Sequence, residues 1–271
     1  METSTRWQLA KDSAEGYARI LVPAILGPAA RTLVDFLPWT GVETVLDAGC
    51  GTGAALGFAA AKAGPTATLV GLDVNQGMLE VAKSGDAFAE NEPQWVNASM
   101  EAMPFKEGHF DVVLCAQTLQ FLKAPESALA EIHRVLKPGG RLGLSLWCGI
   151  QENPYFHALT QAISHQIGAS TAAGLEAAFD LTGPAEIQHL VHAAGFSDIK
   201  LEQGQFEWVT SGLPEFIPRH VGATPMAAGF EAATPQARQA VTGQVVQALE
   251  AFGKAGVFRL PFCTHLLMAK R

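Results

Sequence analysis

Short apolar runs rich in Val and Leu alternate with amphipathic helical patterns between about positions 44 and 148. Buried strands of a parallel sheet have this continuous apolar character, and the helices between them form the crossover connections. The pattern therefore predicts a series of βαβ units and a mostly parallel sheet. The predicted strands are 44–48, 67–73, 94–97, 110–115 and 141–147.

Proline and glycine mark the ends of the predicted helices. The clearest helix begins at Pro125 and ends at the Lys-Pro-Gly-Gly run of 137–140. Ahead of the first strand, Gly27-Pro28 predicts a break in a helical stretch, which leaves 29–37 as a second helix.

The pattern changes after the fifth predicted strand. Residues 150–182 are rich in Ala, Gln and His, and residues 212–256 contain four prolines among helical stretches. Strands are predicted at 199–209 and 262–269. In a doubly wound sheet, the connections after the fifth and sixth strands leave from the carboxyl edge, where ligands bind. We expect the two insertions to converge there as a helical lid.

Composition narrows the possible functions. The chain has 271 residues, of which 48% are hydrophobic, and a formal net charge of −8. This length approaches the limit of one hydrophobic core, so we expect one domain with insertions. The acidic balance argues against binding to nucleic acid or to an anionic membrane, because both need a Lys/Arg surface.

The cysteines and the first residues bear on location. Residues 1–7 lack a basic segment followed by an apolar run, and no apolar stretch approaches the roughly 20 residues of a membrane span. Cys50, Cys115, Cys148 and Cys263 lie far apart without CxxC spacing. We therefore expect a cytoplasmic protein with reduced, buried thiols and no metal site.

A glycine-rich turn follows the first predicted strand. The sequence of 45–53 is Val-Leu-Asp-Ala-Gly-Cys-Gly-Thr-Gly, and glycines there let a ligand approach the backbone closely. Gly49, Gly51 and Ala54 satisfy a dinucleotide-binding pattern, with Asp73 about twenty residues beyond the turn. These residues alone leave a nicotinamide-dependent oxidoreductase open.

Further motifs change this interpretation. Asp47 and Gly53 extend the turn to Asp-x-Gly-x-Gly-x-Gly, and motifs follow in order at 101–105, 110–113 and 133–140. With these motifs the chain resembles a class I S-adenosylmethionine-dependent methyltransferase, of the branch similar to the ubiquinone/menaquinone-biosynthesis C-methyltransferases.

The resemblance is strong over about 40–148 and weaker in the flanks. It implies an α/β fold with a Rossmann-like, doubly wound, seven-stranded sheet whose last strand is antiparallel, and a cofactor bound across the carboxyl ends of the first strands. The implied division is 1–39 for N-terminal helices over the cofactor cleft, 40–149 for the cofactor-binding core, 150–182 and 212–256 for lid insertions, 183–211 for a core continuation, and 257–271 for the final core strand.

The resemblance also implies contacts with S-adenosylmethionine. They fall at Tyr17, Asp47, Ala48, Gly49, Cys50, Gly51, Gly53, Asp73, Val74, Met78, Ser99, Met100, Glu101, Ala116 and Gln117. Asp47 lies near the ammonium group, Asp73 binds both ribose hydroxyls, and Val74 and Met78 pack on the adenine. Trp7 belongs with Tyr17 to the N-terminal segment over the cleft.

Two positions depart from the family pattern. The family usually has Asp where this chain has Ser99, so a weaker bond to the adenine amino group is expected, with the Met100 amide completing adenine recognition. Many relatives carry a histidine pair after the fourth strand, where residues 117–121 here read Gln-Thr-Leu-Gln-Phe. A general base is needed only if the nucleophile starts protonated. Candidate catalytic or substrate-contacting residues are Gln120, His157 and His220.

The expected activity is methyl transfer to O, C or N of a small molecule. Aromatic and apolar residues of the insertions and the adjoining strand ends suggest an apolar or aromatic acceptor, although they could equally form the core of the lid. They are Trp147, Phe156, Phe179, Trp208, Phe216, Met226, Phe230 and Phe252. A cofactor-binding cyclase or binding protein that transfers no methyl group is the alternative, ahead of the nicotinamide enzyme. A homodimer is compatible with the chain.

Overall fold

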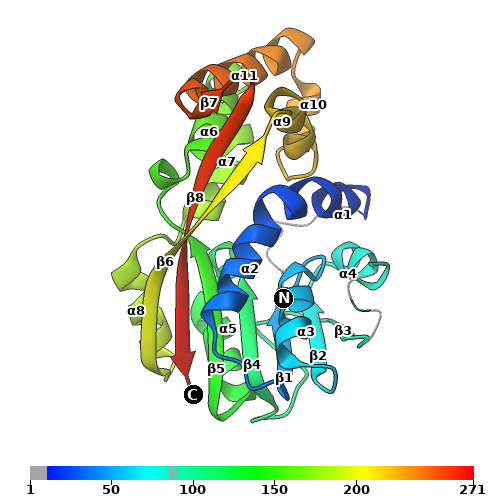
Figure 1. The fold of residues 1–271 in the computed structure, drawn as a ribbon, viewed down its shortest axis with the longest axis vertical. Coiled ribbons are helices and arrows are strands. Elements are labelled where there is room, and N and C mark those ends of the chain that lie inside the picture. The colour runs from blue at the N-terminus through cyan, green and yellow to red at the C-terminus, as the bar shows by residue number, and fades with distance from the viewer. Residues whose placement is uncertain (1–10, 86–87, 89–90) are drawn as a thin grey trace.

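One sheet organises the part of the chain that the computed structural model describes, which is residues 11–85, 88 and 91–271. The strand order is β3-β2-β1-β4-β5-β8-β6, with the short β7 paired to β8 (Figure 1). The strands are β1 (Thr44–Ala48), β2 (Thr68–Asp73), β3 (Gln94–Asn97), β4 (Phe110–Ala116), β5 (Leu136–Trp147), β6 (Ser197–Thr210), β7 (Gly253–Lys254) and β8 (Val257–Lys270).

The strand directions confirm the predicted doubly wound α/β fold. β1 to β5 pair in parallel, and β8 runs antiparallel to both of its neighbours, β5 and β6. The eighth strand, which the sequence pattern did not predict, is the two-residue β7. β6 and β8 are each 14 residues long, and Figure 1 shows both extending from the sheet into a separate group of helices.

Helices cover both faces of the sheet and gather beyond its carboxyl edge. The longer ones are α1 (Lys11–Gly16), η2 (Tyr17–Leu26), α2 (Gly27–Phe36), α3 (Ala54–Ala63), α4 (Gln76–Lys83), α5 (Pro125–Val135), α6 (Pro154–Gln166), α7 (Ala169–Glu176), α8 (Pro184–Ala193), α9 (Leu213–Gly222), α10 (Ala227–Ala232) and α11 (Pro235–Ala248). Short 3-10 turns are η4 (Leu119–Phe121), η5 (Ile150–Glu152), η6 (Ala177–Phe179) and η7 (Glu250–Phe252). Among the described helices, none is both long and apolar enough to span a membrane.

The predicted break at Gly27-Pro28 is wrong. The chain is helical from α1 through the π-helix η2 into α2, and the Gly27 N–H donates to the carbonyl of Val22, five residues back. Pro28 lies in the first turn of α2, and because it has no N–H it removes one donor from this continuous helical ladder. A Cβ at Gly27 would lie 2.6 Å from the Val22 oxygen, so glycine permits the wider turn. The π-turn thus accommodates a pair of residues that otherwise favours a helix end.

Three large apolar clusters form the core. Two lie on opposite faces of the sheet, one under α2 and α3 and the other under α5 and α8. The third joins α6, α7, α9 and α11 to the far ends of β6 and β8 and includes Tyr155, Phe216 and Phe262. We call this third group of elements the lid; Figure 1 shows it beyond the carboxyl edge of the sheet.

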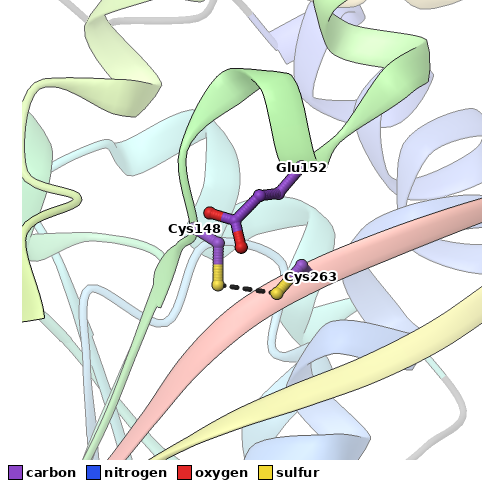
Figure 2. Close-up of side chains that lie close together, drawn as sticks. All are labelled: Cys148, Glu152 and Cys263. Carbon is purple, nitrogen blue, oxygen red and sulfur yellow. Dashed lines mark hydrogen bonds between the residues drawn. The ribbon is translucent and has the colours of Figure 1, made fainter.

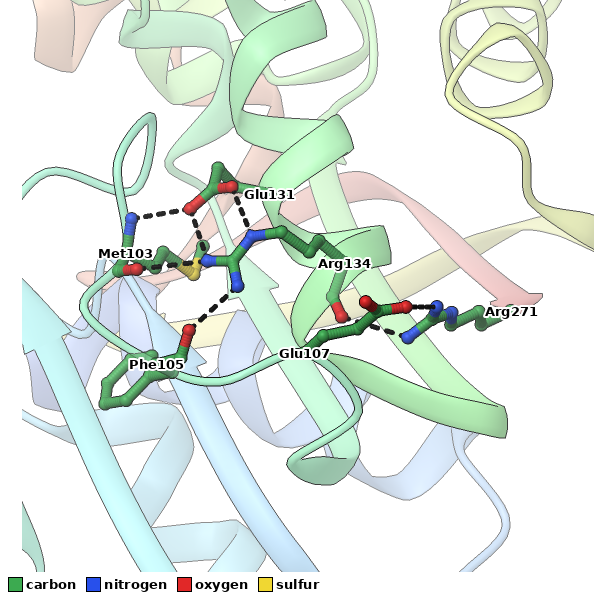
Figure 3. Close-up of polar contacts among 6 residues, drawn as sticks. All are labelled: Met103, Phe105, Glu107, Glu131, Arg134 and Arg271. Atoms are coloured by element: carbon green, nitrogen blue, oxygen red, sulfur yellow. Dashed lines mark hydrogen bonds and ion pairs between the residues drawn. The ribbon is translucent and has the colours of Figure 1, made fainter.

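Arg134 of α5 fixes the loop between β3 and β4 (Figure 3). Its guanidinium donates to both carboxylate oxygens of Glu131 at 2.6 and 2.8 Å, to the Phe105 carbonyl at 2.8 Å and to the Met103 carbonyl at 3.1 Å. Glu131 in turn accepts the Met103 N–H at 2.7 Å. The planar guanidinium meets four acceptors at once, which a lysine ammonium cannot reproduce in this geometry. This loop begins at Ala98, directly after β3, and includes Ser99.

We expect Arg134→Met to lower the free energy of unfolding by about 2 kcal/mol, because it removes charged hydrogen bonds to a partly exposed carboxylate and to two carbonyls. Urea denaturation measures the change. The control is Arg259→Met, since the Arg259 guanidinium pairs with the exposed Glu207 and its loss should change stability by less than about 0.5 kcal/mol. Equal effects of the two substitutions would contradict this account of the loop.

Candidate active site

A cavity lies at the carboxyl ends of β1, β2 and β4, between the sheet and the helices that cover this edge. Its walls come from the glycine turn after β1, the start of α4, the π-helix η2 and the lid. Because parallel strands end at the same edge, segments far apart in sequence meet here.

The glycine turn presents backbone to this cavity. The N–H groups of Gly49 and Cys50 donate to the Leu72 carbonyl at 2.8 and 3.0 Å, which ties the turn to β2. Gly49 has φ +77°, and a Cβ there would lie 2.3 Å from Thr118 Cγ2. At Gly51, with φ +52°, a Cβ would meet nothing within 4 Å. A ligand can therefore approach the main chain at Gly51 without a side chain in between.

Asp73 ends β2 and faces the same turn. Its Oδ2 accepts the Gly51 N–H and its Oδ1 accepts the Asn75 N–H, each at 2.8 Å. Burial nevertheless raises the pKa of Asp73 above its ordinary value, against the lowering effect of these bonds. Both oxygens keep further lone-pair capacity for donors from a ligand.

Asp47 is the more deeply buried carboxylate. Its Oδ2 accepts the Leu56 N–H at 3.1 Å, whereas its Oδ1 is buried and has no hydrogen-bond partner among the described residues. Burial raises the pKa of Asp47 to about 7, and the nearby charge of Asp73 adds to the effect. Tyr17 of η2 lies close enough to feel both charges, and burial is the main cause of its raised pKa. This part of the cavity therefore favours a positively charged ligand.

Gln117 follows β4 in a left-handed conformation, with φ +53°. Its N–H donates to the Ser145 carbonyl at 3.0 Å, and its Nε2 donates to Thr264 Oγ1 at 2.9 Å. Gln120 donates from Nε2 to Gln117 Oε1 at 3.2 Å, and Gln120 Oε1 is buried without a hydrogen-bond partner among the described residues. Residues in this uncommon conformation are held by their surroundings and cluster at functional sites.

The lid contributes one imidazole to the cavity wall. His220 of α9 is only 2% exposed, and its Nδ1 lies 2.7 Å from the hydroxyl of Tyr155 on α6. The two rings stack with centroids 5.5 Å apart and 26° between planes. Burial lowers the pKa of His220 to about 3, so the ring is neutral at physiological pH. Trp147 and Phe156 line the cavity nearby.

The structure gathers most of the residues that the sequence singled out. The cavity is lined by Tyr17, Asp47, Gly49, Cys50, Gly51, Asp73, Val74, Met78, Ser99, Glu101, Ala116, Gln117 and His220. Outside its lining are Ala48, Gly53, Met100, Gln120 and His157. Trp7 lies outside the described residues. Of the eight aromatic and apolar lid candidates, Trp147 and Phe156 line the cavity, while the other six belong to or pack against the lid's core cluster.

Comparison with known proteins identifies the domain. The methyltransferase domain family matches residues 46–144. Nocamycin O-methyltransferase from Saccharothrix syringae is 28% identical over 244 residues, which cover 84% of this chain and 85% of that protein. The ubiquinone/menaquinone biosynthesis C-methyltransferase UbiE from Ectopseudomonas mendocina is 42% identical over 100 residues, or 36% of this chain and 39% of that protein. The chain carries a class I S-adenosylmethionine-dependent methyltransferase domain.

A solved structure agrees on the fold of this methyltransferase. The phosphoethanolamine N-methyltransferase 2 of Haemonchus contortus, solved with S-adenosylhomocysteine, gives a TM-score of 0.59 at 17% identity and covers 97% of this chain and 57% of that one. The cofactor of the methyltransferase is S-adenosylmethionine. This assignment takes the place of the nicotinamide cofactor that the glycine pattern alone had left open.

The described residues fit this cofactor. Asp47 offers a buried, unpaired oxygen where an ammonium or sulfonium group would supply the missing positive charge. Gly51 leaves open space beside the main chain, and the Asp73 oxygens can each accept a further hydroxyl donor. Val74 and Met78 line the cavity beyond Asp73 and offer apolar surface for a flat ring.

Several residues that line the cavity of the methyltransferase were not indicated by the sequence pattern. Thr118 donates from Oγ1 to both the Gly49 and Ala116 carbonyls, at 3.1 and 3.0 Å, and so joins the turns after β1 and β4. Leu21 and Ile25 of η2 also line the cavity. Their apolar character was visible, but the continuous helix that orients them was not.

The buried carboxylate generates a pH prediction. Between pH 4 and 7 folded Asp47 keeps a proton that the unfolded chain has lost, so the ligand-free methyltransferase loses stability as pH rises through this window. Asp47→Asn removes this loss. We expect the variant to be more stable than wild type by about 2–4 kcal/mol at pH 8 and to differ little at pH 4.

Urea denaturation at both pH values measures this difference. Asp35→Asn is the control, because Asp35 is a half-exposed surface carboxylate. A stability gap for Asp47→Asn that is the same at pH 4 and pH 8 would show that the charge of Asp47 is not its cause.

Proposed function

We propose that this methyltransferase transfers the methyl group of S-adenosylmethionine to an oxygen of a small, mostly apolar or aromatic molecule. The observation that carries the proposal is one cavity, which joins the buried Asp47, the partly buried Asp73 and a glycine turn to an apolar, aromatic wall from the lid. The first part suits a cationic nucleoside cofactor, and the second suits an acceptor with little charge.

The residues of the sheet edge would hold the cofactor. S-adenosylmethionine, when bound, supplies a methyl group on a sulfonium, which is transferred by in-line displacement. Asp47 would balance the ammonium charge, and Asp73 would accept the ribose hydroxyls. Gln117, fixed by Thr264 and Gln120, would contact the methionine end. Ser99 and Glu101 of the β3–β4 loop would border the adenine.

The lid wall supports an apolar acceptor. Trp147, Phe156, Leu175 and Ala178 line the cavity, and no lysine or arginine does so among the described residues. We propose that the segments 150–182 and 212–256 enclose the acceptor and exclude water from it. Exclusion of water and alignment of two reactants can supply much of the acceleration of a displacement reaction.

His220 would orient the acceptor. A buried phenol with one polar partner donates its proton to that partner, so Tyr155 assigns the proton of the neutral imidazole to Nε2. An N–H at Nε2 is a donor for an oxygen of the acceptor. A donor at this position favours O-methylation, and the match to an O-methyltransferase, which covers 84% of this chain, supports this choice. The low pKa makes His220 a positioning residue rather than a strong base.

We expect Asp73→Ala to weaken binding of S-adenosylhomocysteine by about 10- to 150-fold, because it removes charged hydrogen bonds to the ribose. Isothermal titration calorimetry measures the dissociation constant. Asp35→Ala is the matched control, since that carboxylate lies on the surface and pairs with Lys62. Undiminished binding by Asp73→Ala would overturn the assignment of the cofactor end.

A panel of neutral phenols and enols, compared with highly charged acceptors, tests the acceptor class by the mass of the methylated product. We expect His220→Phe to lower kcat/KM for the preferred neutral acceptor at least tenfold, with the affinity for S-adenosylhomocysteine changed less than twofold. Tyr155→Phe, which frees Nδ1 but keeps the ring, should have a smaller effect. Turnover of the charged acceptors alone would refute the proposed substrate class.

A further inference from the structure

Two cysteines that are far apart in sequence lie side by side at the end of the β5–β8 pairing. Cys148, which follows β5, donates its N–H to the carbonyl of Cys263 in β8 at 3.1 Å, and the β5–β8 register continues from the pair Trp147–Thr264. The two Sγ atoms lie 2.7 Å apart (Figure 2). Both side chains are buried, at 0% and 4% exposed. Their 115-residue separation gave the sequence no metal-binding spacing.

A carboxylate completes this group. Glu152 ends the 3-10 turn η5, and Figure 2 shows its carboxylate turned toward the two sulfurs. One ligand atom from each residue, the two Sγ atoms and a Glu152 oxygen, lie within 4.8 Å of one another. Oε2 of Glu152 accepts the Gly149 N–H at 3.0 Å, and Oε1 accepts from Gln203 Nε2 at 3.3 Å. Hydrogen bonds of this kind orient a carboxylate as a metal ligand.

Asn153 holds the backbone around the pair. It is fully buried, its Oδ1 accepts the Cys263 N–H at 3.0 Å, and its Nδ2 donates to the Cys263 carbonyl at 3.2 Å and to the Cys148 carbonyl at 3.4 Å. The Asn153 side chain thus links the two backbone segments just beyond the last β5–β8 pair, Trp147 and Thr264. The positions of the two cysteines therefore do not depend on a bond between the sulfurs.

We propose that Cys148, Cys263 and Glu152 bind one zinc ion. Two sulfurs and one oxygen form a donor set that Zn²⁺ accepts, and the exposed side of Glu152 leaves a fourth position for water. This site is separate from the proposed methyl transfer, because neither cysteine nor Glu152 lines the cavity. The role assigned to it is structural.

The binding reaction balances in protons and charge. Two thiols each release one proton to solvent, and the two positive charges of zinc neutralise two of the three negative charges of two thiolates and a carboxylate, so the site keeps one negative charge. Zinc–sulfur bonds of about 2.3 Å in a tetrahedron separate two sulfurs by about 3.8 Å. Rotation of the Cys148 and Cys263 side chains from their present 2.7 Å contact supplies the opening, at the cost of one S–H···S hydrogen bond.

A zinc ion at this position would lie next to residues that shape the active site. Trp147, next to Cys148, lines the cavity, and Thr264, next to Cys263, holds Gln117. Zinc would join β5, the η5 turn that leads into α6, and β8 at one point. It would therefore fix the junction from which the lid leaves the sheet.

The direct test measures zinc by mass spectrometry of metals in purified full-length protein after equilibration with Zn²⁺ and gel filtration. We expect one zinc per chain in wild type and in Cys115→Ala, a control that removes another buried thiol. Cys148→Ala and Cys263→Ala should lose it. Cobalt(II) added in place of zinc should give the near-ultraviolet absorption of thiolate-to-cobalt charge transfer, and this band should be absent from both cysteine variants.

Glu152→Gln tests the zinc site without changing a buried residue. Glu152 is exposed, so the fold should survive, and zinc affinity measured against a chromophoric chelator should fall at least tenfold. The exposed Glu202→Gln is its control and should not change the affinity. A Cys148–Cys263 disulfide in protein that binds no zinc, seen as a mass lower by two hydrogens, would overturn the proposal. Equal zinc affinity in Glu152→Gln and wild type would exclude the carboxylate and overturn it as well.

Discussion

Burial of the Asp47 carboxylate is the constraint around which the site is arranged. A carboxylate at the end of a buried strand, with the Leu56 amide as its one hydrogen-bond partner among the described residues, is costly to keep ionised without a counter-charge. In the described part of the chain, the neighbours Asp73 and Tyr17 add a negative charge and a phenol instead of a positive charge. The ligand-free site is therefore prepared for a cation, whose arrival would favour the ionised form of Asp47. Because glycine has no side chain, the glycine turn beside Asp47 leaves a ligand room to reach this charge.

The two long strands β6 and β8 connect this charged edge to the lid. Their paired far ends carry Trp208, Leu260 and Phe262 into the lid cluster, while β8 returns through Thr264 to hold Gln117. The same strand thus packs the apolar wall and positions a polar residue of the cofactor end. His220 and Tyr155 come from different lid helices, so their hydrogen bond forms only when α6 and α9 pack together.

The sequence was sufficient for features that depend on local pattern. Apolar runs located the seven longer strands to within a few residues, apart from the earlier starts of β5 and β8, and ordered motifs indicated the cofactor. Features that depend on pairing distant segments were not predictable. Nothing local distinguishes His220 from His157, yet only His220 meets a buried tyrosine. At Gly27, turn propensity predicted a helix break. The hydrogen bond from Gly27 to Val22, five residues back, has no periodic pattern in the sequence that could have indicated a continuous helix.

The strand order has a consequence for biosynthesis. β8 lies between β5 and β6, although it is the last strand of the chain. During synthesis, β6 emerges from the ribosome with no partner in the sheet, and it must wait for about fifty further residues before β8 can insert beside it. The sheet and the core cluster of the lid, which includes Leu260 and Phe262 of β8, are therefore completed in the same late event. A ribosome that stalls before this strand would release a chain with an open sheet edge and exposed apolar surface, which is the kind of species that chaperones retain.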